Sequence, residues 1–308
     1  GVCQLVQHEA LDAATQGFVD ALKEALGDAV TIDVQNASGD SVNCGTIVNG
    51  FVAKGVDLIM ANATPALTAA VSATADIPIL GTSITDYATA LGMKEWNGTT
   101  GINVSITAYG VALDIDDFSG TVGGNVSGTS DLADLQKQAQ MILDWFPETK
   151  TVGLLFCSAE PNSRYQIDEV RKALEAQGVT CEEFAFTDSN DVSSVTQKAA
   201  DFSDVVYIPT DNTAASNTEA IANVLIPAGV PAICGEEGLC RGCGVATLSI
   251  SYYDLGVTTG KMAAKILKGE ANISEMPVEY TDATPKYNAS ICDQLGITPL
   301  DGYEAIEG

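Results

Sequence analysis

The sequence is poor in basic residues. It has 14 lysines and arginines and one histidine against 41 aspartates and glutamates, which gives a net charge of −27. Recognition of a DNA or RNA backbone needs a basic surface, so this charge excludes nucleic acid as a partner. The charge also disfavours docking on an anionic membrane surface. No apolar run is long enough to span a bilayer, so no transmembrane helix is expected.

Motifs of several enzyme classes are missing. The first expected strand is followed by Gln7-His8-Glu9 rather than by a glycine-rich phosphate loop, and no Gly-x-x-x-x-Gly-Lys occurs in the chain. Gly-x-Ser-x-Gly is absent as well, which removes the nucleophile elbow of α/β-hydrolases. These absences argue against an enzyme.

The eight cysteines are too few in 308 residues for a disulfide scaffold, and we expect most of them to fill the core. With one histidine, a metal site would have to use mainly thiolates or carboxylates. Only Cys240 and Cys243 have the spacing of metal ligands. We expect no metal and no cofactor, while a local disulfide between these two cysteines stays open.

Short β-branched runs alternate with longer amphipathic stretches, a pattern typical of βαβ units and a parallel sheet. In the first half we expect strands at Val2–Val6, Val30–Val34, Val56–Ala61 and Ile77–Leu80, and helices at Ala10–Leu26, Val42–Lys54 and Pro65–Ala75. In the second half we expect strands at Thr151–Phe156, Val179–Phe186, Val205–Ile208 and Pro231–Cys234, and helices at Asp131–Trp145, Ser163–Gln177, Val192–Phe202, Ala214–Pro227 and Tyr253–Leu267.

The two halves share one order of elements, which predicts an α/β protein with two similar Rossmann-like lobes, each built on a parallel sheet. We assign residues 1–122 and 249–275 to the N-terminal lobe and residues 123–248 and 276–308 to the C-terminal lobe. Ligands of open parallel sheets bind beyond the carboxyl ends of the strands. A ligand cleft at the hinge between the lobes is therefore expected.

Polar residues follow the expected strands at their carboxyl ends. They are Ala63-Thr64 and Thr82-Ser83 in the first half, and Thr210-Asp211-Asn212 and Glu236-Glu237 in the second. Thr64 and the helix turn after it would suit an anion, because the helix dipole favours negative charge there. Asp211 and Glu237 would suit a cation, so a free α-amino acid would satisfy both lobes. Alternatively, Thr64, Asp211 and Asn212 only cap helices.

Seven segments, in order along nearly the whole chain, carry a resemblance to a known family. They are Ala63-Thr64-Pro65-Ala66, Ile77-Pro78-Ile79, Thr85-Asp86, Gly123-Gly124-Asn125-Val126-Ser127-Gly128, Glu160-Pro161-Asn162-Ser163, Pro209-Thr210-Asp211-Asn212-Thr213 and Tyr252-Tyr253-Asp254-Leu255-Gly256. The chain resembles ABC-transporter substrate-binding proteins of the tryptophan and aromatic amino-acid group, which have the type I periplasmic-binding fold. The resemblance implies a receptor that closes two lobes on an aromatic or other apolar L-amino acid.

The resemblance also implies roles for individual residues. It puts Thr64, Thr82 and Ser83 near the ligand carboxylate, Asp211 and Asn212 near the amine, and Asn162 and Ser163 on the face of the second lobe. Glu237 is implied as an amine-binding carboxylate, with Glu236 as a close competitor. Asp86 belongs to one of the matching segments, and Tyr87, where proline is usual, would stack on a ligand ring or cover it. His8, in a segment that departs from the family pattern, is a further candidate contact.

Two features of the family bear on location and partners. Its members are extracytoplasmic, in the periplasm or lipid-anchored on the outer face of the cytoplasmic membrane, and deliver their ligand to ABC permease subunits. The chain opens without a charged n-region or a cleavage site, so we expect any targeting segment to have been removed or never to have existed. Cys3 is not expected to carry a lipid, because it lies within the first strand. We expect a monomer.

Other interpretations stay open. Between Met93 and Ser119 the chain is longer than the family pattern, and an extra loop there would shade the cleft, contact a transporter or be inert surface. A receptor of the same fold for a nucleoside, a sugar or a branched-chain amino acid is the main alternative. An α/β enzyme is a weaker one. The ligand-sensing core of a transcription regulator would need a helix-turn-helix before residue 1 and a less acidic chain.

Overall fold

The computed structural model describes residues 1–91 and 121–306. The chain forms two compact units: unit 1 comprises Gly1–Leu132 and Ser251–Thr281, and unit 2 comprises Ala133–Ile250 and Asp282–Gly308. We expected the breaks after residues 122, 248 and 275. The first and last lie later along the chain because the strands Val126–Ser130 and Glu279–Tyr280 pair within the sheet of unit 1.

Unit 1 contains a six-stranded sheet with the order β11-β5-β4-β3-β1-β2, and its strand pairs are all parallel. Its strands are β1 (Val2–Gln4), β2 (Val34–Asn36), β3 (Ile59–Asn62), β4 (Ile79–Ile84), β5 (Val126–Ser130) and β11 (Glu279–Tyr280). Asn62 lies opposite Thr82, and Ile84 opposite Ser130. The register therefore brings the carboxyl ends of β3, β4 and β5 to one edge of the sheet.

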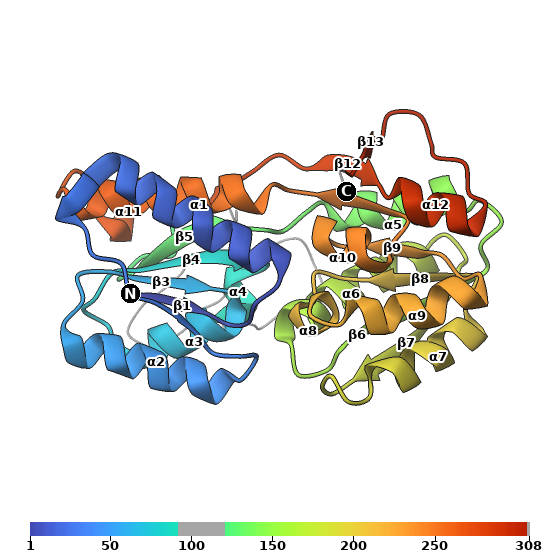
Figure 1. Cartoon of the computed structure of the whole chain (residues 1–308), viewed down its shortest axis with the longest axis horizontal. Coiled ribbons are helices and arrows are strands. Elements are labelled where there is room, and N and C mark those ends of the chain that lie inside the picture. Colours follow the sequence, from blue (N-terminus) through green and yellow to red (C-terminus); the bar gives the residue numbers. More distant parts are fainter. Residues whose placement is uncertain (92–120, 307–308) are drawn as a thin grey trace. The chain divides into compact units, whose positions relative to one another are not determined.

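Helices cover both faces of this sheet. The main ones are α1 (Glu9–Leu26), α2 (Ser41–Lys54), α3 (Thr64–Ala73) and α11 (Tyr252–Leu267), with the shorter α4 (Tyr87–Ala90), η1 (Gly27–Ala29) and η2 (Ile273–Glu275). Figure 1 shows α1 and α11 on one face, and α2 and α3 on the other. Alternate strand residues follow this division: Ile59 packs in the core that contains α2 and α3, while Met60 packs in the core that contains α1 and α11.

Two glycines allow α1 and α11 to pack closely. A Cβ atom on Gly17 of α1 would lie 2.1 Å from the Tyr253 carbonyl oxygen, and one on Gly256 of α11 would lie 2.0 Å from the Ala14 carbonyl oxygen. Both contacts are with backbone atoms, which cannot rotate away. A side chain at either position would therefore push the two helices apart.

Unit 2 contains a seven-stranded sheet with the order β13-β12-β10-β9-β8-β6-β7, parallel except where β12 runs antiparallel to β10. Its strands are β6 (Thr151–Cys157), β7 (Thr180–Phe186), β8 (Val205–Ile208), β9 (Ala232–Cys234), β10 (Ala246–Ser249), β12 (Thr284–Tyr287) and β13 (Glu304–Ala305). Its helices are α5 (Leu135–Trp145), α6 (Pro161–Glu175), α7 (Val192–Phe202), α8 (Asn212–Ala215), α9 (Thr218–Ala228), α10 (Glu237–Cys243) and α12 (Ala289–Leu295).

Several expected elements differ from the structure in their bounds, and the largest differences are in three places. The second strand begins at Val34 instead of ending there. The helix expected over Ala214–Pro227 is divided into α8 and α9, with Ser216 and Asn217 between them. The helix expected from Asp131 begins at Leu135, because the side chain of Asp134 accepts the Lys137 N–H and caps it there.

The expected extra segment between Met93 and Ser119 lies outside the described residues. Over the two ranges that the structure describes, no helix has the length and apolar character needed to cross a membrane.

Candidate functional site

Two buried hydroxyl groups lie at the carboxyl edge of the unit 1 sheet. Thr64 follows β3 and begins α3, and Ser83 lies near the end of β4; their exposed fractions are 3% and 6%. Neither Oγ atom has a hydrogen-bond partner within the described ranges. A buried hydroxyl without a partner is costly, so these two atoms are candidates for hydrogen bonds to a bound molecule.

The backbone at the same edge is strained. Ala63 has φ of 87° and Ser83 has φ of 55°, a region that residues with a side chain seldom adopt. The pairing between β4 and β5 shifts register between Gly81 and Ile84, around Ser83. Backbone strain of this kind gathers at binding sites. Sequence analysis had no signal for it, because neither residue is the glycine or asparagine that usually marks such a conformation.

Thr82 is turned into the protein rather than towards this edge. It is fully buried, and its hydroxyl is 3.1 Å from the hydroxyl of Thr129, which is 2.9 Å from that of Thr259 in α11. This chain of hydroxyls joins two strands to a helix. The structure therefore gives Thr82 an internal partner in place of the expected ligand.

Asp86 and Tyr87 also have structural partners. Asp86 caps α4 by accepting the N–H and the hydroxyl of Thr89. The Tyr87 ring is buried in the unit 1 core, and its hydroxyl donates towards the carbonyl oxygens of Gly81 and Thr129 at 3.1 and 3.2 Å. The expectation that Tyr87 stacks on or covers a ligand is therefore not supported. His8 is half-buried at the N-cap of α1.

At the carboxyl edge of the unit 2 sheet, Asp211 follows β8 and is 1% exposed. Its carboxyl group accepts the backbone N–H groups of Cys157 at 2.6 Å and of Ala214 at 2.8 Å. Burial, with a smaller contribution from the charge of Glu160, raises the pKa of Asp211 to about 8. Asp211 therefore caps α8, as the alternative interpretation of the sequence allowed.

Glu160, which the sequence marks only as part of a motif, organises the residues around Asp211. Its carboxylate accepts the backbone N–H groups of Asn212 at 3.0 Å and of Thr213 at 2.8 Å, together with the side chains of both residues. The amide of Asn162 donates to the Thr210 carbonyl at 3.0 Å, while its buried Oδ1 has no partner in the described parts of the chain. Asn162 thus retains one acceptor for a ligand.

Ser163 and the two glutamates after β9 are already engaged. Ser163 is fully buried and hydrogen-bonds to Asp211. Glu236 is 2% exposed and caps α10 by accepting two backbone N–H groups. Glu237 forms ion pairs with Arg241 at 2.9 Å and with Lys286 at 2.6 Å. The charge of Glu237 is thus balanced by two cations, and the carboxylate of Glu236 is occupied by backbone donors, so both glutamates have partners within the protein.

The eight cysteines are all thiols, and seven of them are buried, Cys181 being the exception. The sequence left open a disulfide between Cys240 and Cys243. The structure does not contain it, and the Cys243 thiol donates to the Leu239 carbonyl. Within the described residues there is no group of three or more histidine, cysteine or acidic side chains that could hold a metal ion.

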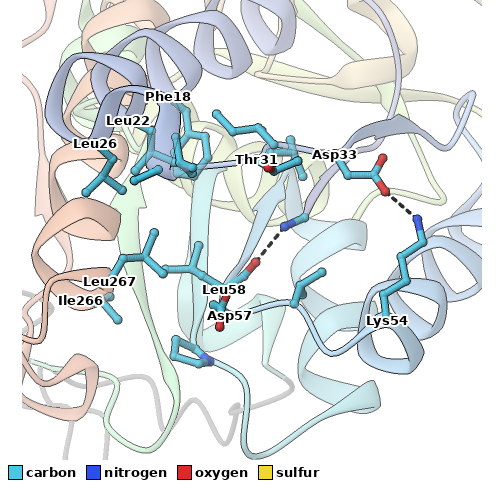
Figure 2. A pocket seen from close by; sticks show the side chains of 17 residues that line it. Phe18, Leu22, Leu26, Thr31, Asp33, Lys54, Asp57, Leu58, Ile266 and Leu267 are labelled. Carbon is cyan, nitrogen blue, oxygen red and sulfur yellow. Dashed lines mark hydrogen bonds and ion pairs between the residues drawn. The ribbon is translucent and has the colours of Figure 1, made fainter.

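Unit 1 also has a cavity of about 880 Å³. Figure 2 shows its apolar wall, with Phe18, Leu22 and Leu267, and a rim that includes the ion pair between Asp33 and Lys54 at 2.7 Å. None of the expected ligand contacts lines this cavity. It is therefore separate from the candidate site at the strand ends.

Comparison with known proteins identifies the family. The model of the ABC transporter substrate binding protein family matches residues 1–111 and 102–302. The chain belongs to this family. It is 31% identical over 287 residues to a protein named tyrosine-binding protein from Clostridioides difficile, covering 92% of this chain and 76% of the relative. The description of this family is that of substrate-binding proteins of transporters rather than of enzymes.

Solved structures of related proteins have the same fold as this chain. A domain from Streptococcus pneumoniae in complex with L-Trp is 32% identical, with a TM-score of 0.86 over 99% of this chain and 98% of that one. A ligand-free, open substrate-binding protein with adhesive properties from Clostridium difficile is 32% identical, with a TM-score of 0.70 over 100% and 98%. These likenesses confirm the predicted α/β, type I periplasmic-binding fold.

Proposed function

We propose that the chain is the extracytoplasmic receptor of an ABC importer and binds an aromatic L-amino acid. The observation that carries this proposal is the near full-length similarity to two proteins described with such ligands, one named for tyrosine and one solved with L-Trp. Structures of sugar-binding proteins match the fold at much lower identity, such as 15% for a glucose-galactose binding protein. They share the architecture alone.

The unpaired hydroxyls of unit 1 support a role in carboxylate binding. The Oγ atoms of Thr64 and Ser83 are buried; Thr64 follows β3 and begins the ten-residue helix α3, and Ser83 lies in the neighbouring strand β4. The positive end of the helix dipole favours a carboxylate at this position. We assign the ligand carboxylate to these two hydroxyl groups.

In unit 2 we propose that Asn162 supplies a polar contact through its unpaired Oδ1, near Asn212, whose side chain donates to the same Glu160 oxygen as the Asn162 amide does. Asp211, Ser163, Glu236 and Glu237 then act as supports, because backbone N–H groups, side-chain hydrogen bonds and ion pairs already satisfy them. We further propose that the receptor is a monomer, that it delivers its ligand to membrane permease subunits, and that it catalyses no reaction.

A thermal-shift screen against the twenty L-amino acids, with sugars and nucleosides as controls, tests this function. Ligand that binds only the native state must raise the unfolding midpoint. We expect shifts with tyrosine, phenylalanine or tryptophan and none with glucose or adenosine. Shifts confined to sugars or nucleosides would overturn the proposed ligand class.

Two variants test the assigned contacts. Thr64→Val and Ser83→Ala remove the unpaired hydroxyls, and each should weaken amino-acid binding by roughly tenfold or more, since a hydrogen bond to a charged group contributes about 1.5–3 kcal/mol. Thr46→Val is the matched control, because it removes an exposed hydroxyl on α2. Equal affinity of all three variants would remove Thr64 and Ser83 from the site.

A further inference from the structure

Asp131 is a buried carboxyl group at the carboxyl edge of the unit 1 sheet that sequence analysis did not select. It directly follows β5 and is 5% exposed. Its Oδ2 atom accepts the hydroxyl of Tyr252 at 2.9 Å, and the Thr85 hydroxyl lies beside the carboxyl group. Its Oδ1 atom is buried and has no hydrogen-bond partner in the part of the chain that the structure describes. One oxygen of the carboxyl group is therefore held in place and the other is unused.

This unused oxygen lies on the same edge as the hydroxyls assigned to the ligand. The backbone N–H of Asp131 donates to the carbonyl of Ile84 at 3.1 Å, which fixes it beside the end of β4. Ser83, the residue before Ile84, has the unpaired buried hydroxyl described above. Neighbouring strands are about 4.8 Å apart. Ser83 and Asp131 are therefore close enough along the edge to contact the two polar groups on the α-carbon of one amino-acid ligand.

The environment of Asp131 calls for a donor. A buried carboxylate oxygen without a hydrogen bond is unfavourable, and burial raises the pKa of Asp131 against the opposing effect of the Tyr252 and Thr85 hydroxyls. A protein donor or a cation would relieve this cost. None of the basic side chains with a recorded ion pair reaches Asp131.

We propose that Asp131 binds the ammonium group of the amino-acid ligand through its Oδ1 atom, while Tyr252 positions the carboxyl group through Oδ2. This inference rests on the proposed function. The proposal places the contact with the ligand ammonium group in unit 1. The carboxyl groups of Asp211 and Glu237, which the sequence suggested for this contact, already have partners within the protein. The ligand class follows from the pairing of a carboxylate acceptor with adjacent hydroxyl donors: a zwitterionic α-amino acid.

The test compares two ligands that differ only in the amine. Affinities for L-tyrosine and for 3-(4-hydroxyphenyl)propionate, which lacks the amine, are measured by isothermal titration calorimetry on the wild-type protein and on Asp131→Asn. The wild-type protein should bind L-tyrosine at least tenfold more tightly than the des-amino compound. Asp131→Asn should lose most of this preference through weaker L-tyrosine binding, and its retained binding of the des-amino compound shows that the variant is folded.

Asp134→Asn is the matched control, because this nearby carboxylate caps α5 with its side chain 45% exposed. It should keep the wild-type preference. If Asp131→Asn keeps that preference too, the assignment of Asp131 is wrong although the proposed function stands. If Asp131→Asn binds neither compound, the second variant Asp131→Ser is used, and circular dichroism shows whether each variant is folded. A folded Asp131→Ser that prefers L-tyrosine as strongly as the wild-type protein would also overturn the assignment. If the wild-type protein binds no amino acid, the proposed function itself fails.

Discussion

The carboxyl group of Asp211 accepts the backbone N–H of Cys157 at 2.6 Å, which ties the start of α8 to the end of β6. A residue that the sequence presents as a ligand contact is thus part of the internal framework of unit 2. The same carboxyl group also accepts the Ala214 N–H. Loss of this side chain would leave two backbone donors without a partner in a buried region.

We therefore predict that Asp211→Ala mainly affects stability. The free energy of unfolding should fall by about 2–6 kcal/mol, since two buried donors lose their acceptor and each costs about 1–3 kcal/mol. Urea unfolding measures this loss. The control is Asp204→Ala, because the exposed Asp204 also accepts two backbone N–H groups, which water can satisfy in the variant. Equal losses in the two variants would contradict the buried role of Asp211.

The pKa of Asp211 also predicts a pH dependence. Burial raises its pKa to about 8 from an ordinary value of 3.8, so the native state holds the proton more tightly than the unfolded state does. The contribution of this group to stability is then complete below about pH 4 and is lost as the pH rises towards 8. Urea midpoints should show a larger stability difference between the wild-type protein and Asp211→Ala at pH 5 than at pH 8. The opposite trend would mean that the native state favours the charged carboxylate.

Glu237→Gln should leave ligand affinity unchanged. The Glu237 carboxylate is paired with Arg241 and Lys286, so no free charge is lost from the ligand site. The expected cost is a stability loss of about 1 kcal/mol, typical of partly exposed ion pairs. Calorimetric titration with L-tyrosine gives the affinity. A tenfold weakening in a folded variant would restore the amine-binding role that the resemblance implied.

Backbone strain at Ala63 predicts a contrast between two alanine-to-glycine variants. Ala63 has φ of 87°, which glycine adopts freely, whereas Ala61 lies within β3. Both methyl groups are buried, so removing either one lowers the free energy of unfolding by a similar amount through lost packing. Ala63→Gly should therefore be less destabilising than Ala61→Gly by about 1–3 kcal/mol, the cost of such a conformation. Matching unfolding midpoints would show that Ala63 is not strained.

The cysteines should behave as protected thiols. Seven of them are buried, and burial raises the pKa of Cys181, the half-buried one, to about 11. Because the thiolate is the reactive form, native protein should react slowly with a thiol reagent such as dithionitrobenzoate. Denatured protein should titrate eight thiols without a reductant. A denatured count of six would reveal a disulfide that the structure does not contain.

The fold could be predicted from the sequence because alternating strand and helix patterns are local and repeat in both halves. The bounds of the elements are harder to predict. Near Asp131 the sequence does not show where strand β5 ends and helix α5 begins, and the start of α5 at Leu135 is set by the Asp134 cap. Thr64 follows β3 as expected, whereas Ser83 lies within β4, which extends to Ile84 instead of ending at Leu80.

The partners of the polar side chains could not be predicted. Asp211 and Glu237 are acids at strand ends, and the sequence does not show that Cys157 donates to one or that Lys286, from a distant strand, pairs with the other. In the same way, the sequence pattern predicts Asp131 as the start of a helix and gives no signal for its unpaired oxygen. Such contacts depend on tertiary packing rather than on local pattern.

Isothermal titration calorimetry of the wild-type protein with L-tyrosine, L-phenylalanine and L-tryptophan tests the central claim most directly. We predict one-to-one binding of at least one of them with a Kd of about 1 μM or tighter, equivalent to about 8 kcal/mol, and no binding of glucose or adenosine. Binding of glucose or adenosine, with no heat from any of the three amino acids, would contradict the account.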